Sequence, residues 1–542
     1  MKQLTKQVFI VAAIVFSLLA LAGTFFLVRH YAALSRRVEH LDKHCSALKN
    51  ISRSTPTAVS TPNNSWLEIQ KRVKDTVVQV FCHASEFNWL EPYKTPEQSE
   101  GAGSGFFINA EGDLISNYHV VAQASGVEIQ IPSFGLERFD VDIVGVTPDR
   151  DIALLRLTPD AKQKIKHKIG TLPFLPLGDS DCILRSQEVL ALGYPLGQSR
   201  LKSTLGIVSG RERLGNTGLI QISAPLNPGS SGGPALNTAG EVIGIISSGI
   251  PSAQNVGYII PINEVTSALK DLPNEKLLRK PTLGCLFTGA TPEMVGYLGN
   301  PGDGGWYIAK VFKGTLFESV GIKGGDMLYE INGHRVDMYG DLDVPWSEDK
   351  ASLFEFLNRL NVGDQLTLTV YRKGERKEFT FKFEPKFLPP IRMIYPEFEK
   401  AATDYEVIGG MVVMELSINH VMMLKNRAPD LMRFGKIEQQ HEPAVIITNV
   451  LPNSQAFKAR VLLPGEIVET VNGKAVKTLQ DFREALLHKT KGDYITFTTD
   501  DNFCAVLSVE KMVKEEEMLA ARYFFKRSAI LAALAARAAG KK

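Results

Sequence analysis

Cysteine is scarce in this sequence. Its 542 residues include five cysteines, which stand at Cys45, Cys82, Cys182, Cys285 and Cys504. None of them belongs to a Cys-x-x-Cys pair, and no histidine cluster stands beside them. Thiols that are so few and so scattered exclude a disulfide-stapled scaffold and give no sign of a zinc site.

An excess of charge of one sign is also absent. Lys and Arg number 61 and Asp and Glu number 59, which leaves a formal net charge of +2. A near-neutral chain has no global electrostatic attraction to nucleic acid, so we expect no nucleic-acid partner. The hydrophobic fraction of 44% and the charged fraction of 22% argue against wholesale disorder and against a polytopic membrane protein. At roughly 150 residues per domain, the length predicts three or four domains.

A long uncharged hydrophobic run stands at the N-terminus. Residues 8–28 follow Lys2 and Lys6, and this run of 21 residues is long enough to cross a bilayer core of about 30 Å. We therefore predict a transmembrane signal-anchor over residues 1–30. A cleaved signal peptide, with residues 20–22 (ALA) as the processing site, is the alternative. Residues 31–65 are predicted to form a short amphipathic helix followed by a flexible linker rich in Ser, Thr, Pro and Asn.

Residues 66–275 are dominated by short apolar runs separated by Gly, Pro and Asp. The predicted strands are 77–81, 105–108, 113–116, 127–131, 141–146, 152–157, 188–192, 242–246 and 256–260. Many short strands separated by turn residues are typical of a β-barrel or a β-sandwich. The region is long enough to form two small barrels packed together.

Three segments of this region carry residues suited to nucleophilic catalysis. Ser231 lies in a Gly-rich turn (residues 227–234, NPGSSGGP), His119 follows a predicted strand, and Asp151 opens another. A serine hydroxyl needs a base to take its proton, and a histidine base needs a carboxylate to fix its tautomer. Taken alone, each segment is also compatible with an ordinary turn or a structural hydrogen bond. The order His, Asp, Ser along the chain is that of chymotrypsin-type enzymes.

The same segments resemble the HtrA/Deg family of serine proteases. The similar segments are 103–108 (GSGFFI), 117–121 (NYHVV), 151–155 (DIALL), 193–197 (GYPLG), 206–209 (GIVS), 229–234 (GSSGGP) and 255–261 (NVGYIIP). The resemblance implies a mainly β, chymotrypsin-like double β-barrel protease domain over residues 66–275. It implies His119 as general base, Asp151 as its orienting partner and Ser231 as nucleophile, with the N–H groups of Gly229 and Ser231 as the oxyanion hole.

The resemblance also implies where specificity resides. The segment before Ser231 and the strand near residues 255–260 would border the primary specificity pocket, with a preference for small or medium aliphatic side chains. No acidic residue stands in residues 221–230 that would attract Lys or Arg. Ser230 replaces the asparagine usual in the family. The polar segment 83–100, which contains Trp89, is expected to form an exposed regulatory loop.

An internal repeat follows the protease region. Residues 310–336 and 449–476 share a template of strand, polar turn, short helix, Gly-containing turn, strand and Asn-Gly hairpin. The template resembles PDZ domains, here of the divergent plant-type Deg pair. We predict two PDZ-like α+β domains over residues 280–385 and 386–512. PDZ domains bind a peptide as an added strand, and the predicted carboxylate-binding loops are 297–308 and 408–413. A structural role without a ligand is the alternative for the second domain.

The C-terminal residues 513–542 are Ala-rich and are predicted to form a helix that docks on the protein or on a membrane surface. The resemblance as a whole implies a membrane-anchored, single-pass serine endopeptidase of protein quality control on the periplasmic or another extracytoplasmic side. Its partners would be unfolded or misfolded polypeptides, peptides at the PDZ-like domains, and further copies of the chain in trimers or multiples of trimers. No cofactor and no metal is required. The alternatives are a chaperone or scaffold with little or no proteolysis, and an esterase with the same three residues.

Overall fold

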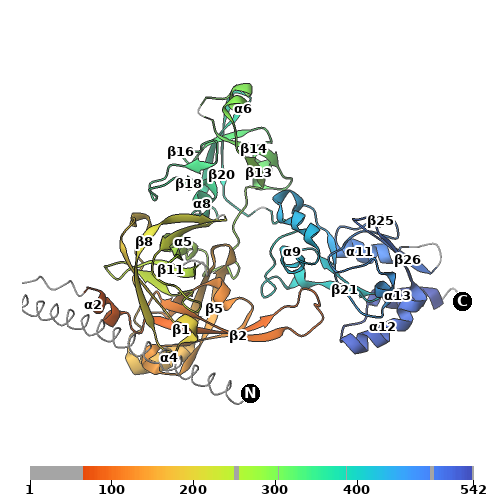
Figure 1. Ribbon diagram of the computed structural model, residues 1–542, viewed down its shortest axis with the longest axis horizontal. Coiled ribbons are helices and arrows are strands. Elements are labelled where there is room, and N and C mark those ends of the chain that lie inside the picture. The colour runs from red at the N-terminus through yellow and green to blue at the C-terminus, as the bar shows by residue number, and fades with distance from the viewer. Residues whose placement is uncertain are drawn as a thin grey trace, which may run out of the picture. The chain divides into compact units, whose positions relative to one another are not determined.

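The computed structural model describes residues 65–215, 217–249, 255–302, 304–385, 387–488 and 493–539 (Figure 1). The predicted membrane anchor, the short amphipathic helix and nearly all of the linker therefore lie outside the described residues. Among the residues that are described, no helix is long and apolar enough to cross a membrane.

The first barrel contains six strands and closes on itself in the order β1-β2-β3-β6-β5-β4. Its strands are β1 (Val77–Glu86), β2 (Glu97–Phe107), β3 (Asp113–Ser116), β4 (Ala124–Gln130), β5 (Arg138–Thr147) and β6 (Ile152–Leu157). Helix α2 (Ser65–Arg72) precedes it, and its connections contain α3 (Tyr118–Val121), η1 (Pro132–Phe134) and η2 (Pro148–Arg150). Helix α4 (Pro159–Ile169) and η3 (Ser180–Cys182) lead to the second barrel.

The second barrel also has six strands, in the order β10-β11-β12-β9-β8-β7. They are β7 (Glu188–Gly193), β8 (Lys202–Leu214), β9 (Thr217–Ile222), β10 (Pro234–Leu236), β11 (Val242–Gly249) and β12 (Gly257–Pro261). A short η4 (Pro195–Gly197) follows β7, and α5 (Ile262–Ala268) follows β12. The predicted double barrel is confirmed, although the sequence did not predict strands β8, β9 and β10. Strand β8 buries only one of its 13 side chains, so it lacks the apolar run that marks a strand.

Side chains alternate between the two faces of each strand and so form three hydrophobic cores, one inside each barrel and one between the barrels. In β6, Ala153 and Leu155 face the interior of the first barrel, whereas Ile152 and Leu154 join a core shared by the two barrels. Strand β7 does the same from the second barrel. Because both faces of these strands are buried, they appear in the sequence as uninterrupted apolar runs. The shared core holds the two barrels together.

The region after the barrels begins with an antiparallel sheet in the order β13-β14-β15-β19-β20. Its strands are β13 (Cys285–Thr288), β14 (Trp306–Val311), β15 (Met327–Ile331), β16 (His334–Arg335), β19 (Gln365–Arg372) and β20 (Glu375–Lys382). A separate pair is formed by β17 (Asp341–Leu342) and β18 (Ala351–Ser352). The helices are α6 (Pro292–Tyr297), α7 (Leu316–Val320) and α8 (Leu353–Asn358).

The last region repeats this plan in the order β21-β22-β23-β24-β26-β27. Its strands are β21 (Tyr405–Ile408), β22 (Met411–Glu415), β23 (Val445–Val450), β24 (Ile467–Val471), β25 (Lys474–Ala475), β26 (Tyr494–Thr499) and β27 (Cys504–Ser508). Its helices are η5 (Lys400–Thr403), α9 (Ile418–Leu424), η6 (Pro429–Gly435), η7 (Ile437–Gln439), α10 (Gln455–Ala459) and α11 (Leu479–Leu486). The predicted repeat is visible in the two Asn-Gly hairpins. Asn332, Gly333, Asn472 and Gly473 all have positive φ, as a type I′ turn requires.

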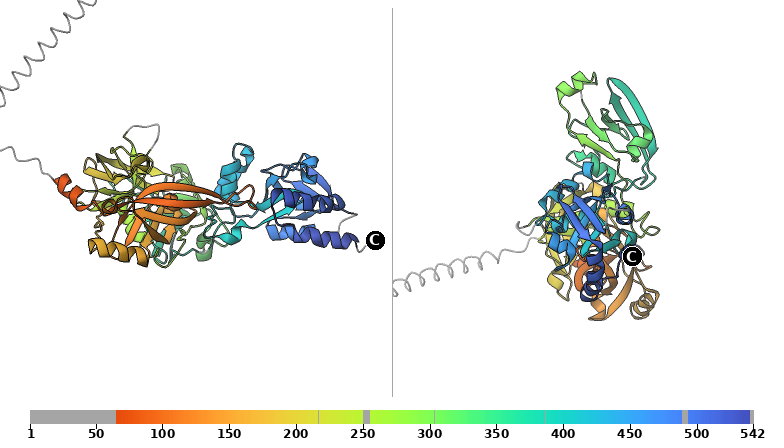
Figure 2. Two further views of the ribbon diagram at one scale, coloured as in Figure 1. Left: turned by 90° about the horizontal axis from the view of Figure 1, so that it is seen from below. Right: turned by 90° about the vertical axis from the view of Figure 1, so that its right-hand side faces the viewer.

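The C-terminal segment forms two helices, α12 (Val509–Tyr523) and α13 (Ala529–Ala539), rather than the single helix expected from the sequence (Figure 2). The chain breaks at Phe524, whose φ is +62°. Phe525 is buried beside Val407 and Val412, whereas Phe524 is exposed. This segment therefore docks on the last sheet of the protein itself.

The segment 83–100 is not the exposed loop that its polar sequence suggested. It forms the far half of a long β1–β2 hairpin, which pairs as far as Glu86 and Glu97 (orange in Figure 1). At the tip, Trp89 is only 5% exposed and its ring meets the His420 ring edge-on at 5.2 Å. The Thr448 hydroxyl donates a hydrogen bond to the Leu90 carbonyl at 3.0 Å. The tip of the hairpin is thus buried against the last domain of the chain.

Candidate active site

His119 and Asp151 come together because their strands pair. Strand β3 runs into α3, which carries His119, and it pairs with β6, which begins just after Asp151. The Asp151 carboxylate accepts hydrogen bonds from the ring Nδ1 of His119 at 2.8 Å and from the His119 backbone N–H at 2.9 Å. Asp151 itself has φ +54° at the end of η2. Its left-handed backbone turns the side chain back toward α3, which an ordinary strand residue would not do.

Ser231 lies in the turn between β9 and β10, flanked by Gly229 (φ +93°) and Gly232 (φ +87°). Its hydroxyl donates a hydrogen bond to the Ser247 carbonyl at 2.9 Å. The hydroxyl of Ser247 in turn donates to the Asp151 carboxylate at 3.3 Å. The structure therefore links the three predicted residues through Ser247, and within the described residues it shows no hydrogen bond from Ser231 to His119.

The two predicted oxyanion donors are free of internal hydrogen bonds within the described residues. Neither the N–H of Gly229 nor that of Ser231 donates to any residue in the described parts of the chain. The Pro228 carbonyl, which precedes Gly229, is engaged by the Leu196 N–H at 2.6 Å. A Cβ on Gly229 would lie 2.5 Å from the Tyr194 carbonyl oxygen, so only glycine fits there. Both N–H groups remain available to an oxygen of a ligand.

Sequence reasoning missed the residues that hold this turn. The buried Ser104 hydroxyl donates to the Gly229 carbonyl at 2.8 Å and accepts the Tyr194 N–H at 2.9 Å. The Ser104 N–H donates to the Ser231 carbonyl at 2.8 Å. A Cβ on Gly232 would lie 2.1 Å from the Ser104 carbonyl oxygen. The first barrel thus supports the turn of the second barrel that carries Ser231. The only sequence signal was the position of Ser104 in the GSGFFI segment.

The two segments expected to border the specificity pocket do lie together. Strand β12 pairs with β9, so that Gly257 faces Ile222 and Tyr258 faces Gln221. A Cβ on Gly257 would lie 2.5 Å from the Leu226 side chain. Apolar side chains and a bare glycine therefore meet just ahead of the Ser231 turn.

In the described part of the chain, no group of three His, Cys, Asp or Glu side chains is placed to hold a metal ion.

The prediction that residues 297–308 form the carboxylate-binding loop of the first repeat domain is wrong. Strand β14 begins at Trp306 within it and pairs with β13 on one side and β15 on the other, so no peptide strand can be added there. The edge strand is β13, which follows Gly284 (φ +76°). Among the described residues, β13 pairs only with β14, which leaves its outer edge open to a peptide.

The corresponding edge of the last domain is occupied by the chain itself. The predicted loop 408–413 forms the tight turn between β21 and β22, with Gly409 and Gly410 at its centre. Strand β21 pairs with β22 along its whole length. From helix α11, Arg483 holds β21 through ion pairs with Asp404 at 2.7 Å and Glu406 at 3.0 Å. A peptide strand can pair with the edge of β22 only if β21 first separates from that edge.

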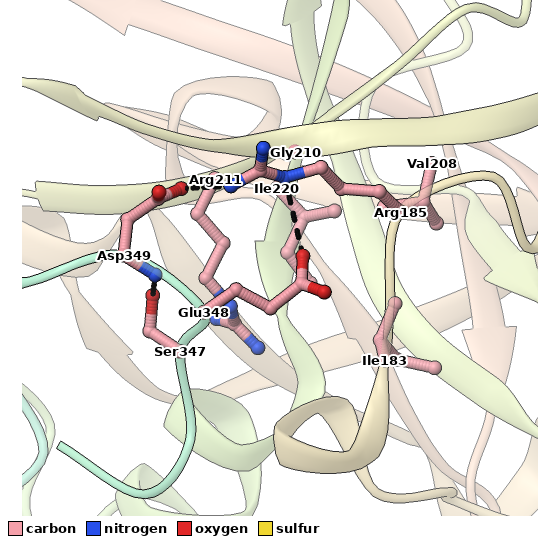
Figure 3. Close-up of a pocket in the computed structure, with 9 residues that line it drawn as sticks. All are labelled: Ile183, Arg185, Val208, Gly210, Arg211, Ile220, Ser347, Glu348 and Asp349. Carbon is pink, nitrogen blue, oxygen red and sulfur yellow. Dashed lines mark hydrogen bonds and ion pairs between the residues drawn. The ribbon is translucent and has the colours of Figure 1, made fainter.

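A small cavity lies where the second barrel meets residues 341–350 of the first repeat domain (Figure 3). Arg185 reaches across to Glu348 at 3.1 Å and to Asp349 at 2.5 Å. The volume of about 10 Å³ has room for about one water molecule. This cavity therefore marks an ion-pair contact between the two domains rather than a ligand site.

Comparison with known families follows the same division. Residues 103–245 match a trypsin-like peptidase domain, and residues 281–383 and 395–529 each match a PDZ domain. The chain carries a trypsin-like peptidase domain and two PDZ domains. The resemblance to the HtrA/Deg proteases, and the prediction of a peptidase, are thereby confirmed.

Two curated relatives and one solved structure illustrate what this chain is similar to. A probable periplasmic serine endoprotease DegP-like from Marinomonas sp. (strain MWYL1) is 25% identical over 494 residues, which are 89% of this chain and 93% of the relative. Protease Do-like 1, chloroplastic, from Arabidopsis thaliana is 31% identical over 309 residues, which are 54% of this chain and 65% of the relative. A solved structure described as "HtrA-type protease AlgW with decapeptide" matches with a TM-score of 0.47 and 23% identity, over 60% of this chain and 99% of that one.

Proposed function

We propose that the chain is a serine endopeptidase that cleaves unfolded or damaged proteins, with Ser231 as nucleophile, His119 as general base and Asp151 as its orienting partner. The observation that carries the proposal is the Asp151 carboxylate, which bonds both the ring Nδ1 and the backbone N–H of His119. That pair of bonds leaves the imidazole Nε2 as the only ring acceptor. The names of the relatives, which are serine endoproteases, support the same activity.

Catalysis would begin when the Ser231 hydroxyl exchanges its bond to the Ser247 carbonyl for one to His119 Nε2. Its oxygen then attacks the peptide carbonyl carbon while the proton passes to Nε2. The N–H groups of Gly229 and Ser231 stabilise the oxyanion. The imidazolium protonates the leaving amine, the C–N bond breaks, and water hydrolyses the acyl-enzyme by the reverse proton transfers.

The surroundings of the site support a polypeptide substrate. Leu226, Ile222 and the bare Gly257 would favour a small or medium aliphatic side chain beside the scissile bond. The open edge of β13 would bind peptide in the first PDZ domain. The second PDZ domain would bind peptide only after release of β21, so we assign it a structural role in the state described here.

The proposed architecture comprises an anchor at 1–30, a linker at 31–65, the protease domain at 66–275, PDZ domains at 280–385 and 386–512, and the C-terminal segment 513–542. A quality-control role outside the cytoplasm, assembly as trimers or multiples, and anchoring through the N-terminal segment belong to the same proposal. Relatives named as periplasmic support the location.

The test compares the full chain with Ser231→Ala in the cleavage of a reduced, unfolded protein and in labelling by a fluorophosphonate probe. We expect Ser231→Ala to lower cleavage by at least about a thousandfold and to abolish labelling. The matched control is Ser230→Ala, which removes the neighbouring hydroxyl and should keep both activities.

Other outcomes would overturn the proposal. Equal cleavage by the wild type and Ser231→Ala would show that the nucleophile lies elsewhere. Absence of cleavage together with suppressed aggregation of the unfolded protein would identify a chaperone or scaffold. Hydrolysis of small esters without cleavage of protein would identify an esterase.

A further inference from the structure

The lead-in to the second PDZ domain contacts the helix that carries His119. The Tyr118 hydroxyl donates to the Glu397 carboxylate at 2.7 Å, and the Gln123 backbone N–H donates to the same oxygen at 3.2 Å. Tyr118 is the first residue of α3, and Gln123 stands two residues beyond its end. One carboxylate oxygen, 279 positions along the chain from Tyr118, therefore brackets the helix.

The segment that carries Glu397 is held in place by contacts of the residues beside it. The Tyr118 ring meets the Tyr395 ring edge-on at 5.5 Å, and the Arg279 guanidinium lies 4.8 Å above the Tyr395 ring. Arg279 also forms an ion pair with Glu399 and donates to the Met393 carbonyl at 2.9 Å. Phe398 packs against the core of the first barrel. The segment that presents Glu397 is thus fixed to the protease domain on both sides.

Helix α3 needs such support. It has only four residues, and its N-cap residue Asn117 makes no side-chain capping bond. A single helical turn is not stable by itself in water, so its position depends on tertiary contacts. The Asp151 carboxylate fixes the ring and the N–H of His119, and the Asp151 carbonyl accepts a hydrogen bond from the side chain of the N-cap residue Asn117 at 2.9 Å. Within the described residues, Asp151 makes no hydrogen bond to Tyr118 or to Gln123. Burial, together with the negative charge of Glu397, raises the pKa of Tyr118, so its hydroxyl stays protonated and remains a donor.

We infer that Glu397 is a positioning residue for His119, and that it acts through the Tyr118 hydroxyl and the Gln123 amide. The inference rests on the proposed role of His119 as the general base. It makes a residue outside the protease domain part of the support of the active site. The protease domain alone would lack this support.

The first test measures kcat and KM of the full chain on a peptide substrate. Since a misplacement of about 1 Å can cost a hundredfold in rate, Glu397→Ala should lower kcat by about tenfold to a hundredfold and leave KM within about twofold. Glu397→Gln keeps an oxygen that accepts both bonds and should restore most of kcat. Tyr118→Phe should lower kcat less, and its effect should not add to that of Glu397→Ala.

The matched control is Glu442→Ala. Glu442 is an exposed carboxylate of the same PDZ domain, paired with Lys477 at 3.0 Å, and its loss should leave kcat unchanged. A wild-type kcat in Glu397→Ala would overturn the inference. So would an equal loss of kcat in Glu397→Gln, because that variant keeps the bonds.

A second test does not depend on activity. Hydrogen–deuterium exchange of residues 117–123 is measured in Ser231→Ala, with and without Glu397→Ala. We expect exchange of residues 117–123 to rise by about tenfold in Glu397→Ala, because local opening costs less free energy without the two hydrogen bonds to Glu397. Exchange in β19 and β20 should stay the same. Unchanged exchange at 117–123 would overturn the inference. Cleavage that survives Ser231→Ala would overturn the proposed function instead, so the two failures are distinguishable.

Discussion

At the scale of single residues, the geometry of the Ser231 turn depends on a buried serine of the other barrel. Ser104 is fully buried in β2 of the first barrel, yet its hydroxyl joins two loops of the second barrel. One loop contains Gly229 and the other contains Tyr194. A short polar side chain with one donor and two acceptor positions is suited to satisfy both loops at once.

Replacement of Ser104 by Ala should therefore affect both stability and catalysis. The Tyr194 N–H and the Gly229 carbonyl would be left buried without partners, at a cost of about 1–3 kcal/mol in the free energy of unfolding. We expect kcat to fall more than KM rises, because the oxyanion donors lose their support. Urea denaturation and peptide-cleavage kinetics measure the two effects.

Ser125→Ala is the control for this prediction. The Ser125 hydroxyl also donates to a backbone carbonyl of the first barrel, that of His83, but it is exposed. Its loss should change stability by less than about 0.5 kcal/mol. If Ser104→Ala behaved like Ser125→Ala in both assays, Ser104 would not be the support described here.

At the scale of elements, the β1–β2 hairpin contributes its tip to the hydrophobic core of another domain. Trp89 packs with Ile394 and Met414 and lies against His420. His420 is fully buried, and its Nδ1 accepts the Ser417 N–H at 3.1 Å, which fixes the neutral tautomer. Burial lowers the pKa of His420 to about 3. The contact therefore requires a neutral histidine.

Acidification should weaken the second PDZ domain around this contact. The pKa of His420 in the folded state, about 3, lies below the ordinary histidine value of 6.5, so the unfolded state takes up the proton first. The stabilisation is complete above pH 6.5 and is lost as the pH falls from 6.5 toward 3. At pH 5 the loss relative to pH 7.5 should be about 2 kcal/mol. Hydrogen exchange of residues 405–424 at the two pH values measures it.

His420→Gln should remove this component of the pH dependence. His167→Gln, which replaces an exposed histidine of α4, should leave the pH dependence as it is in the wild type. A pH dependence that survives unchanged in His420→Gln would show that another group is responsible.

At the scale of the whole molecule, charged residues join the first PDZ domain to the second barrel in two different ways. The Arg359–Asp181 ion pair is largely shielded from water, and the guanidinium also lies 4.4 Å above the Trp346 ring. Arg185 pairs with Glu348 and Asp349, but all three side chains are about half exposed (Figure 3). Exposed pairs contribute about 0–1 kcal/mol, whereas shielded hydrogen bonds between charged groups contribute about 1.5–3 kcal/mol.

The two arginines should therefore differ in effect. Arg359→Ala should raise hydrogen exchange of residues 179–183 by about tenfold, since a loss of about 1.4 kcal/mol corresponds to that factor. Arg185→Ala should raise it by less than about threefold. Equal effects of the two substitutions would contradict the assignment of the shielded pair as the main attachment.

The candidate catalytic residues and the domain order were predictable because their signals are local. Ser231 stands in a Gly-rich turn, His119 and Asp151 flank apolar strands, and the two PDZ templates repeat along the chain. Strands β3 and β6 were predicted with the bounds that they have, because each contains adjacent buried apolar residues and has turn residues close to its ends. Backbone conformation and side-chain type act over a few residues, so such features can be recognised in sequence.

What the tertiary structure alone decided are the contacts between distant segments. Three such contacts are the burial of Trp89, the pairing of β21 with the edge of β22, and the hydrogen bonds of α3 and its flank to Glu397. Each joins segments whose sequences give no local sign of the contact. Their energies come from shape complementarity and from hydrogen bonds between segments that lie hundreds of residues apart, at separations of 279 for Tyr118–Glu397 and 358 for Leu90–Thr448, which no local pattern records. The local chemistry of this chain determined what its active-site residues can do, whereas the packing of distant segments decided what holds them in position.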